Sequence, residues 1–378
     1  MVMADFPQAE FEARTEKAQR AMAAAGMDAL FLTTEAEIRY FTGFRTLFWQ
    51  SPTRPWFLIV PRAGKPIAII PEIGRALMRA TWLDDIRTWS SPAEQDDGIS
   101  LLVEVLSASG TVGMPMGREA TLRMPPADFE RLREQAGFDP VDATPLVQAL
   151  RMVKSEAEIE IISAICGIAS SGFENAANLF HVGQSLEDAF RAFRIDLIRQ
   201  GADDVPYLVG GAGQGGYADV ISPPDDTPLR AGDVLMLDTG ATLKGYYCDF
   251  DRNWAFGHAS DAAKRAYATL YRATNAALDV ARPGATCRDL FLAMQQVIGQ
   301  GGSDVGRFGH GLGMQLTEAP SHIDFDRTVL RENMVLTLEP SMVVEGDRIM
   351  VHEENIVIRS GAPQLLSRRA PAELPILS

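Results

Sequence analysis

A short acidic hairpin constrains the fold of this chain more than any other segment. In LDTGATLKGYYCDFDRNW, residues 237–254, an apolar run ends at Asp238, and the run that returns after a turn carries Asp249 and Asp251. Because strand side chains alternate, we expect Asp249 to return beside Asp238, with Asp251 on the same face. Three crowded carboxylates need a cation or raised pKa values. The hairpin therefore predicts a cation site; the alternative is an exposed hairpin with hydrated aspartates.

Three downstream segments carry further metal-ligand types. His310 lies between glycines in RFGHGLG, Glu339 ends the apolar run MVLTLEPSM, and Glu353 and Glu354 interrupt IMVHEENIVI. One strand glutamate is usually solvent-exposed, but the same pattern on separate strands favours a shared site. Carboxylates with one imidazole suit a pair of divalent Mn, Co, Fe or Zn ions.

The order and context of these residues resemble the pita-bread metallopeptidase family, which includes aminopeptidase P, prolidase, methionine aminopeptidase and creatinase. The similarity extends to LRMVKSEAEIEII, PLRAGDVLMLDTGA and the N-terminal RYFTGF, and so covers nearly the whole chain. In the resemblance Glu353 rather than Glu354 is the ligand, because the family pattern places one acidic or polar residue after it; Glu354 stays an alternative. The implied ligands of a dinuclear centre are Asp238, Asp249, His310, Glu339 and Glu353.

The chain also divides into two parts. It is long enough for two cores, and near residue 150 a long helical pattern begins, with Ser155 and Glu158 spaced as a capping box. We therefore expect an α/β (α+β) fold, with a creatinase/prolidase-like domain at 1–148 and a pita-bread catalytic domain at 149–378. The pattern predicts helices at 10–25, 126–136, 185–200, 260–281 and 286–299, a hairpin from residue 55, and a glycine-rich loop at 210–226.

Composition excludes several classes. A net charge of −15 without a basic stripe disfavours nucleic acid, and no apolar run approaches the roughly 20 residues that span a bilayer. The N-terminus has no secretory pattern, so we expect a cytoplasmic protein. Cys166, Cys248 and Cys287 are scattered and odd in number, which indicates free thiols.

Three positions depart from the family pattern. Its peptidases carry two further histidines, where this chain has Ile221 and Thr317, and many members have threonine where this chain has Asp251. Isoleucine cannot donate a hydrogen bond and threonine replaces an imidazole only in part. Asp251 is either an extra ligand or general base, or the partner of a nearby arginine such as Arg252.

The resemblance implies a metal-dependent hydrolase of a C–N bond in a dipeptide or small peptide-like amide, as in Xaa-Pro peptidases. Glu339 is the expected general base, with Asp251 and Thr317 as further catalytic candidates. Arg45 and His322 are candidates for substrate binding, and an ordinary surface role is the alternative for each. The resemblance also implies a homodimer in which an N-terminal domain reaches the partner's site.

The alternatives keep the fold and change the chemistry. A family member acting on a small metabolite would resemble creatinase, ectoine hydrolase or a dimethylsulfoniopropionate lyase, and in a lyase Asp251 would remove the proton next to a carbonyl. An inactive binding homologue is the third alternative.

Overall fold

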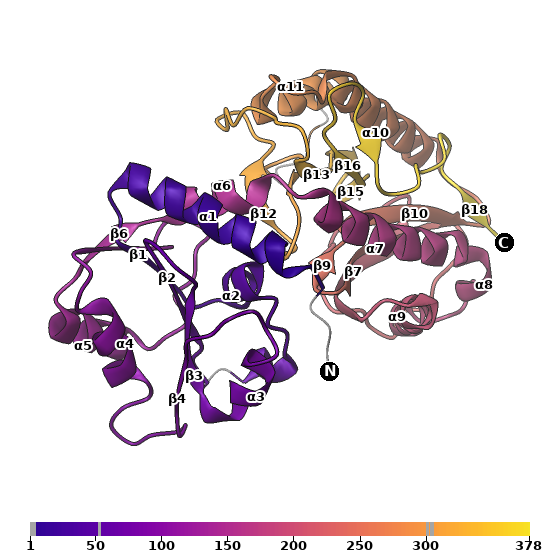
Figure 1. The fold of residues 1–378 in the computed structure, drawn as a ribbon. Helices are drawn as coiled ribbons and strands as arrows, with labels where there is room; N and C mark the ends of the chain where they lie inside the picture. Colours follow the sequence, from indigo (N-terminus) through magenta and orange to yellow (C-terminus); the bar gives the residue numbers. More distant parts are fainter. Residues whose placement is uncertain (1–4, 52–53, 300–301, 303–305) are drawn as a thin grey trace. The chain divides into compact units, whose positions relative to one another are not determined.

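The computed structural model describes residues 5–51, 54–299, 302 and 306–378 (Figure 1). The chain divides into two compact units, Met1–Arg151 and Met152–Ser378, close to the junction expected at residue 148. Both units combine helices with β-sheet, which confirms the α/β class. Among the helices of the described residues, none has both the length and the apolar character that crossing a bilayer requires.

The N-terminal unit is built on one six-stranded sheet. Its strand order is β4-β3-β2-β1-β5-β6, with β2 antiparallel to both β1 and β3, and the other neighbours parallel. The predicted hairpin corresponds to β2 and β3. The strands are β1 (Ala29–Leu32), β2 (Phe57–Pro61), β3 (Ile67–Pro71), β4 (Ile86–Trp89), β5 (Thr111–Met114) and β6 (Asp139–Asp142).

The helices of this unit follow their capping signals. The predicted helix 126–136 is α5 (Pro126–Ala136), which has proline at its start and Gly137 in the left-handed conformation after its end. Helices α4 and α5 cover one sheet face, where Leu102 and Leu132 pack with Phe31 and Phe57. The other helices are α1 (Gln8–Ala25), α2 (Glu35–Thr42), α3 (Arg75–Met78), α4 (Ile99–Leu106) and α6 (Thr144–Met152).

The C-terminal unit contains two five-stranded sheets and a separate hairpin. The first sheet has the order β18-β10-β8-β7 with β9 on β8, the second is β12-β11-β13-β16-β17, and β14 pairs with β15. The strands are β7 (Asp204–Gln214), β8 (Asp233–Leu243), β9 (Tyr246–Tyr247), β10 (Phe250–Phe256), β11 (His310–Gly311), β12 (Glu318–Ser321), β13 (Val335–Leu338), β14 (Ser341–Glu345), β15 (Arg348–Val351), β16 (Glu354–Val357), β17 (Gln364–Leu365) and β18 (Ile376–Leu377).

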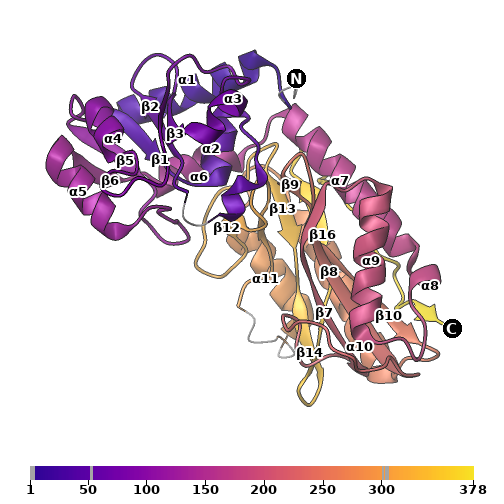
Figure 2. The same cartoon turned by 90° about the horizontal axis from the view of Figure 1, so that it is seen from below.

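Long helices cover these sheets (Figure 2). Helices α7 and α9 pack against β8 and β7, and α10 packs against the β14–β15 hairpin. Helix α7 begins with the predicted capping box, in which Ser155 and Glu158 satisfy each other's backbone N–H groups. The helices are α7 (Glu156–Glu174), α8 (Ala176–Leu179), α9 (Leu186–Gln200), α10 (Asp261–Val280) and α11 (Cys287–Ile298).

The glycine-rich segment differs from the expected loop. Strand β7 runs through its first part as far as Gln214. The glycines there permit close backbone contact: a Cβ at Gly210 would lie 2.0 Å from the carbonyl oxygen of Met236, and one at Gly211 would lie 2.4 Å from that of Asp219. In a sequence, glycine indicates close approach of two backbones as well as turns. The glycines of residues 210–216 therefore predicted a loop where part of β7 lies.

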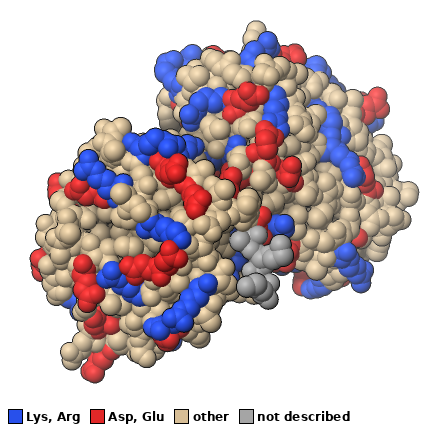
Figure 3. Space-filling view, viewed as in Figure 1, with Lys and Arg blue, Asp and Glu red and all other residues tan. Residues whose placement is uncertain are grey.

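Surface charge is mixed. On the face shown in Figure 3, lysine and arginine side chains are interspersed with aspartate and glutamate, and neither sign forms a continuous stripe in that view. The three cysteines are buried free thiols.

Candidate metal centre

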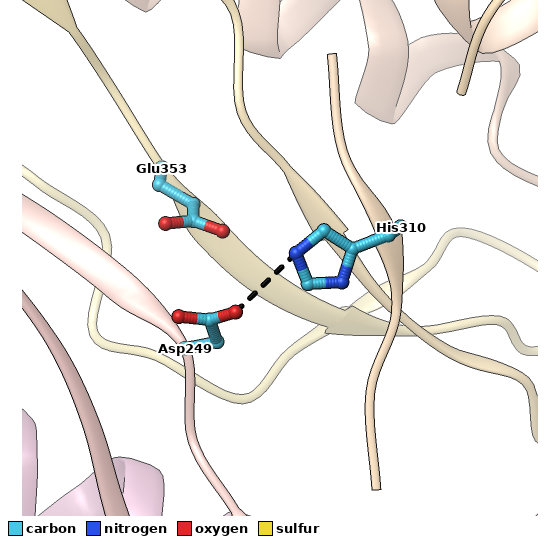
Figure 4. Close-up of side chains that lie close together, drawn as sticks. All are labelled: Asp249, His310 and Glu353. Atoms are coloured by element: carbon cyan, nitrogen blue, oxygen red, sulfur yellow. Dashed lines mark ion pairs between the residues drawn. The ribbon is translucent and has the colours of Figure 1, made fainter. Parts of the chain in front are cut away.

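Three predicted ligands meet inside the C-terminal unit (Figure 4). One ligand atom each from Asp249, His310 and Glu353 lies within 4.8 Å of the others, and all three residues are buried. They come from the residue before β10, from β11 and from the residue before β16. Because each belongs to a different strand segment, the fold itself assembles the cluster.

The ring of His310 is oriented so that Nε2 faces the cluster. Its Nδ1 lies 2.8 Å from the carbonyl oxygen of Gly311, and its Nε2 lies 3.3 Å from Oδ2 of Asp249. The first contact assigns the proton to Nδ1, so that the Nε2 lone pair points at a carboxylate oxygen. Two lone pairs at that distance need a proton or a metal ion between them.

The remaining predicted ligands, Asp238 and Glu339, lie near this cluster, and their metal binding stays a prediction. Leu338 pairs with Glu354 in the β13–β16 ladder, which brings the next residues, Glu339 and Glu353, together at its end. Burial raises the pKa of Asp238, and the neighbouring charges of Asp249 and Glu339 raise it further. Among the described residues, Oδ1 of Asp238 and Oε1 of Glu353 have no hydrogen-bond partner.

Electrostatics make this cluster costly without a cation. Burial raises the pKa of Asp249 and of Glu353, and nearby carboxylates add to the shift at Glu353. Burial also raises the pKa of Glu339 to about 7, against the lowering effect of His310. Buried carboxylates that repel one another, two of them with orphaned oxygens, fit divalent metal ions of the Mn, Co, Zn or Fe type.

The hairpin register places Asp251, not Asp249, opposite Asp238. The turn consists of Lys244 and Gly245, both with positive φ, and a two-residue turn of this kind sets which residues face each other. The sequence-based expectation that Asp249 returns beside Asp238 was therefore wrong by two residues. The charge of Asp249 nevertheless raises the pKa of Asp238, so the two carboxyl groups still lie near each other.

Asp251 is buried and holds the neighbouring segment. Its Oδ1 accepts the backbone N–H of Glu353 at 2.7 Å, and its Oδ2 accepts the side-chain amide of Asn253 at 3.3 Å. Burial and then the charge of Asp238 raise its pKa. The contacts show it supporting the backbone of Glu353, and its catalytic role stays a prediction.

The two adjacent glutamates face different surroundings. Glu354 is fully buried and its carboxylate lies 3.0 Å from both Arg252 and Arg369; it also accepts the N–H of Ala370 and the hydroxyl of Ser367. Burial opposes its ionisation, but the charges of Arg252 and its other neighbours outweigh this and lower its pKa to about 2. With its oxygens occupied, Glu354 is not available to the metal cluster, which supports Glu353 as the ligand.

Tyr207 is a site residue that the sequence did not indicate. It lies on β7 opposite Gly240, and its ring packs over that glycine together with Leu316. Its phenol lies close enough to Asp238 to lower the pKa of that carboxyl group, against the larger effect of burial. Burial and then the charge of Asp238 raise its pKa, so the phenol remains a neutral donor. The only available signal was an aromatic residue in the unrecognised strand β7.

Arg307 is a second residue without a sequence signal. Its charge opposes the effect of burial on the pKa values of Asp249 and Glu339, and its Nη2 lies 3.3 Å from Oγ1 of Thr317. Thr317, a predicted catalytic residue, therefore accepts a hydrogen bond from the guanidinium group of Arg307 near the cluster. Ile221 lies in an exposed segment.

The predicted substrate-binding residues lie in different surroundings. His322 is fully buried, where its Cδ2 lies 2.7 Å from the position that a Cβ on Gly309 would occupy. Burial and the nearby His310 lower the pKa of His322 to about 3, so its ring is neutral. Arg45 belongs to the N-terminal unit and forms an ion pair with Asp5 at 3.2 Å. Substrate contact by either residue stays a prediction.

Family models match both units. The model described as metallopeptidase family M24 matches residues 160–360, and the creatinase/prolidase N-terminal domain matches residues 14–153. The chain is 27% identical over 368 residues to a protein named probable dipeptidase PepE of Mycobacterium tuberculosis, covering 93% of this chain and 95% of that protein. It is 23% identical to an Xaa-Pro dipeptidase of Pyrococcus furiosus, covering 93% and 97%.

Solved structures show the same fold. The crystal structure of dipeptidase PepE from Mycobacterium ulcerans superposes with a TM-score of 0.85 at 25% identity, covering 98% of this chain and 99% of that one. A prolidase from Thermococcus sibiricus gives 0.86 at 22% identity, covering 97% and 99%. The expected pita-bread fold with a creatinase-like N-terminal domain is confirmed.

Proposed function

The chain belongs to metallopeptidase family M24, and on this premise we propose that it is a metal-dependent dipeptidase acting on Xaa-Pro dipeptides or similar small peptide-like amides. One observation carries the proposal: the buried cluster of Asp249, His310 and Glu353 has a ligand set and an orphaned oxygen that fit a metal ion. The full-length similarity to proteins named dipeptidases supports the substrate class.

We propose two divalent ions, of Mn, Co, Zn or Fe, as the cofactor. Bound ions of this kind polarise the scissile carbonyl and lower the pKa of water from about 15.7 toward 7. The proposed ligands are Asp238, Asp249, His310, Glu339 and Glu353.

Glu339 is the proposed proton carrier. As a carboxylate beside the proposed metal ions, it would take a proton from the attacking water and return it to the leaving nitrogen. The hydroxyl of Thr317, which accepts from Arg307 and keeps its own proton, is the proposed hydrogen-bond donor near the substrate oxygen, in place of one of the family's imidazoles. Asp251 maintains the position of Glu353 through its backbone N–H.

A second candidate is a small metabolite as the substrate. It is favoured by the two departures: Ile221 is 77% exposed and Thr317 contacts Arg307, so neither supplies an imidazole. In a lyase of this kind Asp251 would act as the base that removes a proton next to a carbonyl.

Metal analysis combined with a substrate screen tests both candidates. The purified protein is expected to retain divalent metal and to cleave Xaa-Pro dipeptides, whereas Asp249→Ala loses metal and activity. Asp226→Ala, which removes an exposed carboxylate of the same unit, is the matched control. Turnover of creatine, ectoine or dimethylsulfoniopropionate without dipeptide cleavage would establish the second candidate. A metal-free protein without turnover would indicate an inactive binding homologue.

We also propose that the protein acts in the cytoplasm as a homodimer in which Arg45 reaches the partner's site. Light scattering after gel filtration measures the mass of the particle. Arg45→Gln is expected to raise KM in the dimer, and a monomeric, fully active protein would contradict this arrangement.

A further inference from the structure

Arg307 is held at the edge of the metal cluster by the backbone of the residue that follows it. The carbonyl oxygen of Phe308 accepts the N–H of Glu339 at 3.0 Å, and the N–H of Phe308 donates to the carbonyl oxygen of His322 at 2.9 Å. These bonds attach Phe308 to Glu339, the residue after β13, and to His322, the residue after β12. The backbone next to Arg307 is therefore held in place beside Glu339, a predicted ligand.

The guanidinium group has unused donors. Its one hydrogen bond joins Nη2 to Oγ1 of Thr317 at 3.3 Å, and no carboxylate of the described residues forms an ion pair with Arg307. A guanidinium carries five N–H donors. A half-buried arginine with one neutral acceptor keeps most of these donors, and its charge, available to an anion.

The cluster itself does not neutralise this charge once metal is bound. Two divalent cations would balance the four carboxylates among the proposed ligands. The positive charge of Arg307 would then remain available to an anion, and a substrate carboxylate can supply one.

We propose that Arg307, oriented by the hydroxyl of Thr317, binds the free carboxylate of the substrate, so that the site selects dipeptides over their C-terminal amides. This inference rests on the proposed dipeptidase function. It gives Thr317 a positioning role in addition to its proposed role as a donor, because its hydroxyl oxygen accepts from the guanidinium. It also places the carboxylate anchor in the same unit as the metal cluster, whereas Arg45 is engaged by Asp5 in the other unit.

Matched substrates test the anchor. We compare an Xaa-Pro dipeptide with its C-terminal amide in the wild type, Arg307→Gln and Arg307→Lys, with metal content measured for each. The wild type is expected to favour the dipeptide in kcat/KM by about 10- to 100-fold, because a charge-assisted bidentate contact is lost in the amide. Arg307→Gln should bring this ratio close to one, mainly through the KM of the dipeptide, and Arg307→Lys should lie between.

Two controls separate the anchor from general damage. Arg288→Gln removes an equal charge from a surface ion pair with Asp324 and should keep the wild-type ratio. Thr317→Val should lower the ratio without loss of metal. A ratio that is the same in wild type and Arg307→Gln would overturn the proposal.

A binding measurement separates this proposal from the proposed function. Calorimetry on the metal-loaded protein compares L-proline with L-prolinamide and needs no turnover. If no dipeptide is cleaved, the proposed function fails, while tighter binding of proline that disappears in Arg307→Gln still supports the anchor. Equal binding of the two probes would reject it.

Discussion

Glu354→Gln and Glu353→Gln should differ in opposite ways: the first should lower the stability of the metal-free protein, and the second should abolish metal binding. Glu354 has its pKa lowered to about 2 from an ordinary 4.5, and a change of this size corresponds to roughly 3 kcal/mol of stability at neutral pH. Glu354→Gln removes that contribution and leaves Arg252 and Arg369 without a carboxylate partner, so we expect a loss of about 3 to 5 kcal/mol. Because the folded-state pKa is lowered, the contribution is present above pH 4.5 and is lost as the pH falls toward 2.

Glu353→Gln should instead be almost neutral for stability without metal. Burial and then Glu339 raise the pKa of Glu353, so the metal-free site favours the uncharged acid, which glutamine imitates in shape. Metal binding should be lost, because the amide replaces an anionic ligand.

Urea unfolding of the metal-free variants, followed by circular dichroism, measures the first effect, and metal titration measures the second. The two variants lie at adjacent positions and make the same change of side chain, so each controls for the other. A stable Glu354→Gln protein that no longer binds metal would refute the assignment of Glu353 as the ligand.

Three further outcomes are expected. The metal-free protein should lose stability as the pH rises from about 5 to 8, because the raised pKa of Glu339 favours the folded state only while that group is protonated, and added metal should abolish this loss in thermal melts. Tyr207→Phe should lower kcat about 10-fold at unchanged metal content, since the polar hydroxyl beside Asp238 is lost; an unchanged rate would exclude the phenol from catalysis. Gly240→Ala should impair activity, because its Cβ would lie 2.3 Å from Leu316, and wild-type kinetics would contradict this packing.

Local patterns predicted the framework of this protein well. The capping box of Ser155 and Glu158 marked the start of α7, and the turn chemistry around Pro126 and Gly137 bounded α5. These signals are readable because they depend on residues a few positions apart. The register of Asp251 follows from the same kind of local information, since the two-residue turn of Lys244 and Gly245 determines it.

Contacts between distant segments were not readable. Tyr207 lies near Asp238 because β7 pairs with β8, and the glycines of β7 indicated a loop as readily as a closely packed strand. Arg307 could not be singled out from its own segment, because its contact with Thr317 and its position near the cluster depend on residues of other segments.

The sequence by itself determined which residues are able to bind metal and in what order, because ligand chemistry and strand-ending carboxylates are properties of short segments. Only the tertiary structure decided which of two adjacent glutamates joins the cluster. Glu353 and Glu354 are equivalent as chemistry, and they differ because alternate residues of a strand face opposite sides: one side holds Asp249 and His310, and the other holds Arg252 and Arg369. The two residues therefore differ in ionisation. Burial raises the pKa of Glu353, whereas Arg252 and Arg369 help to lower the pKa of Glu354.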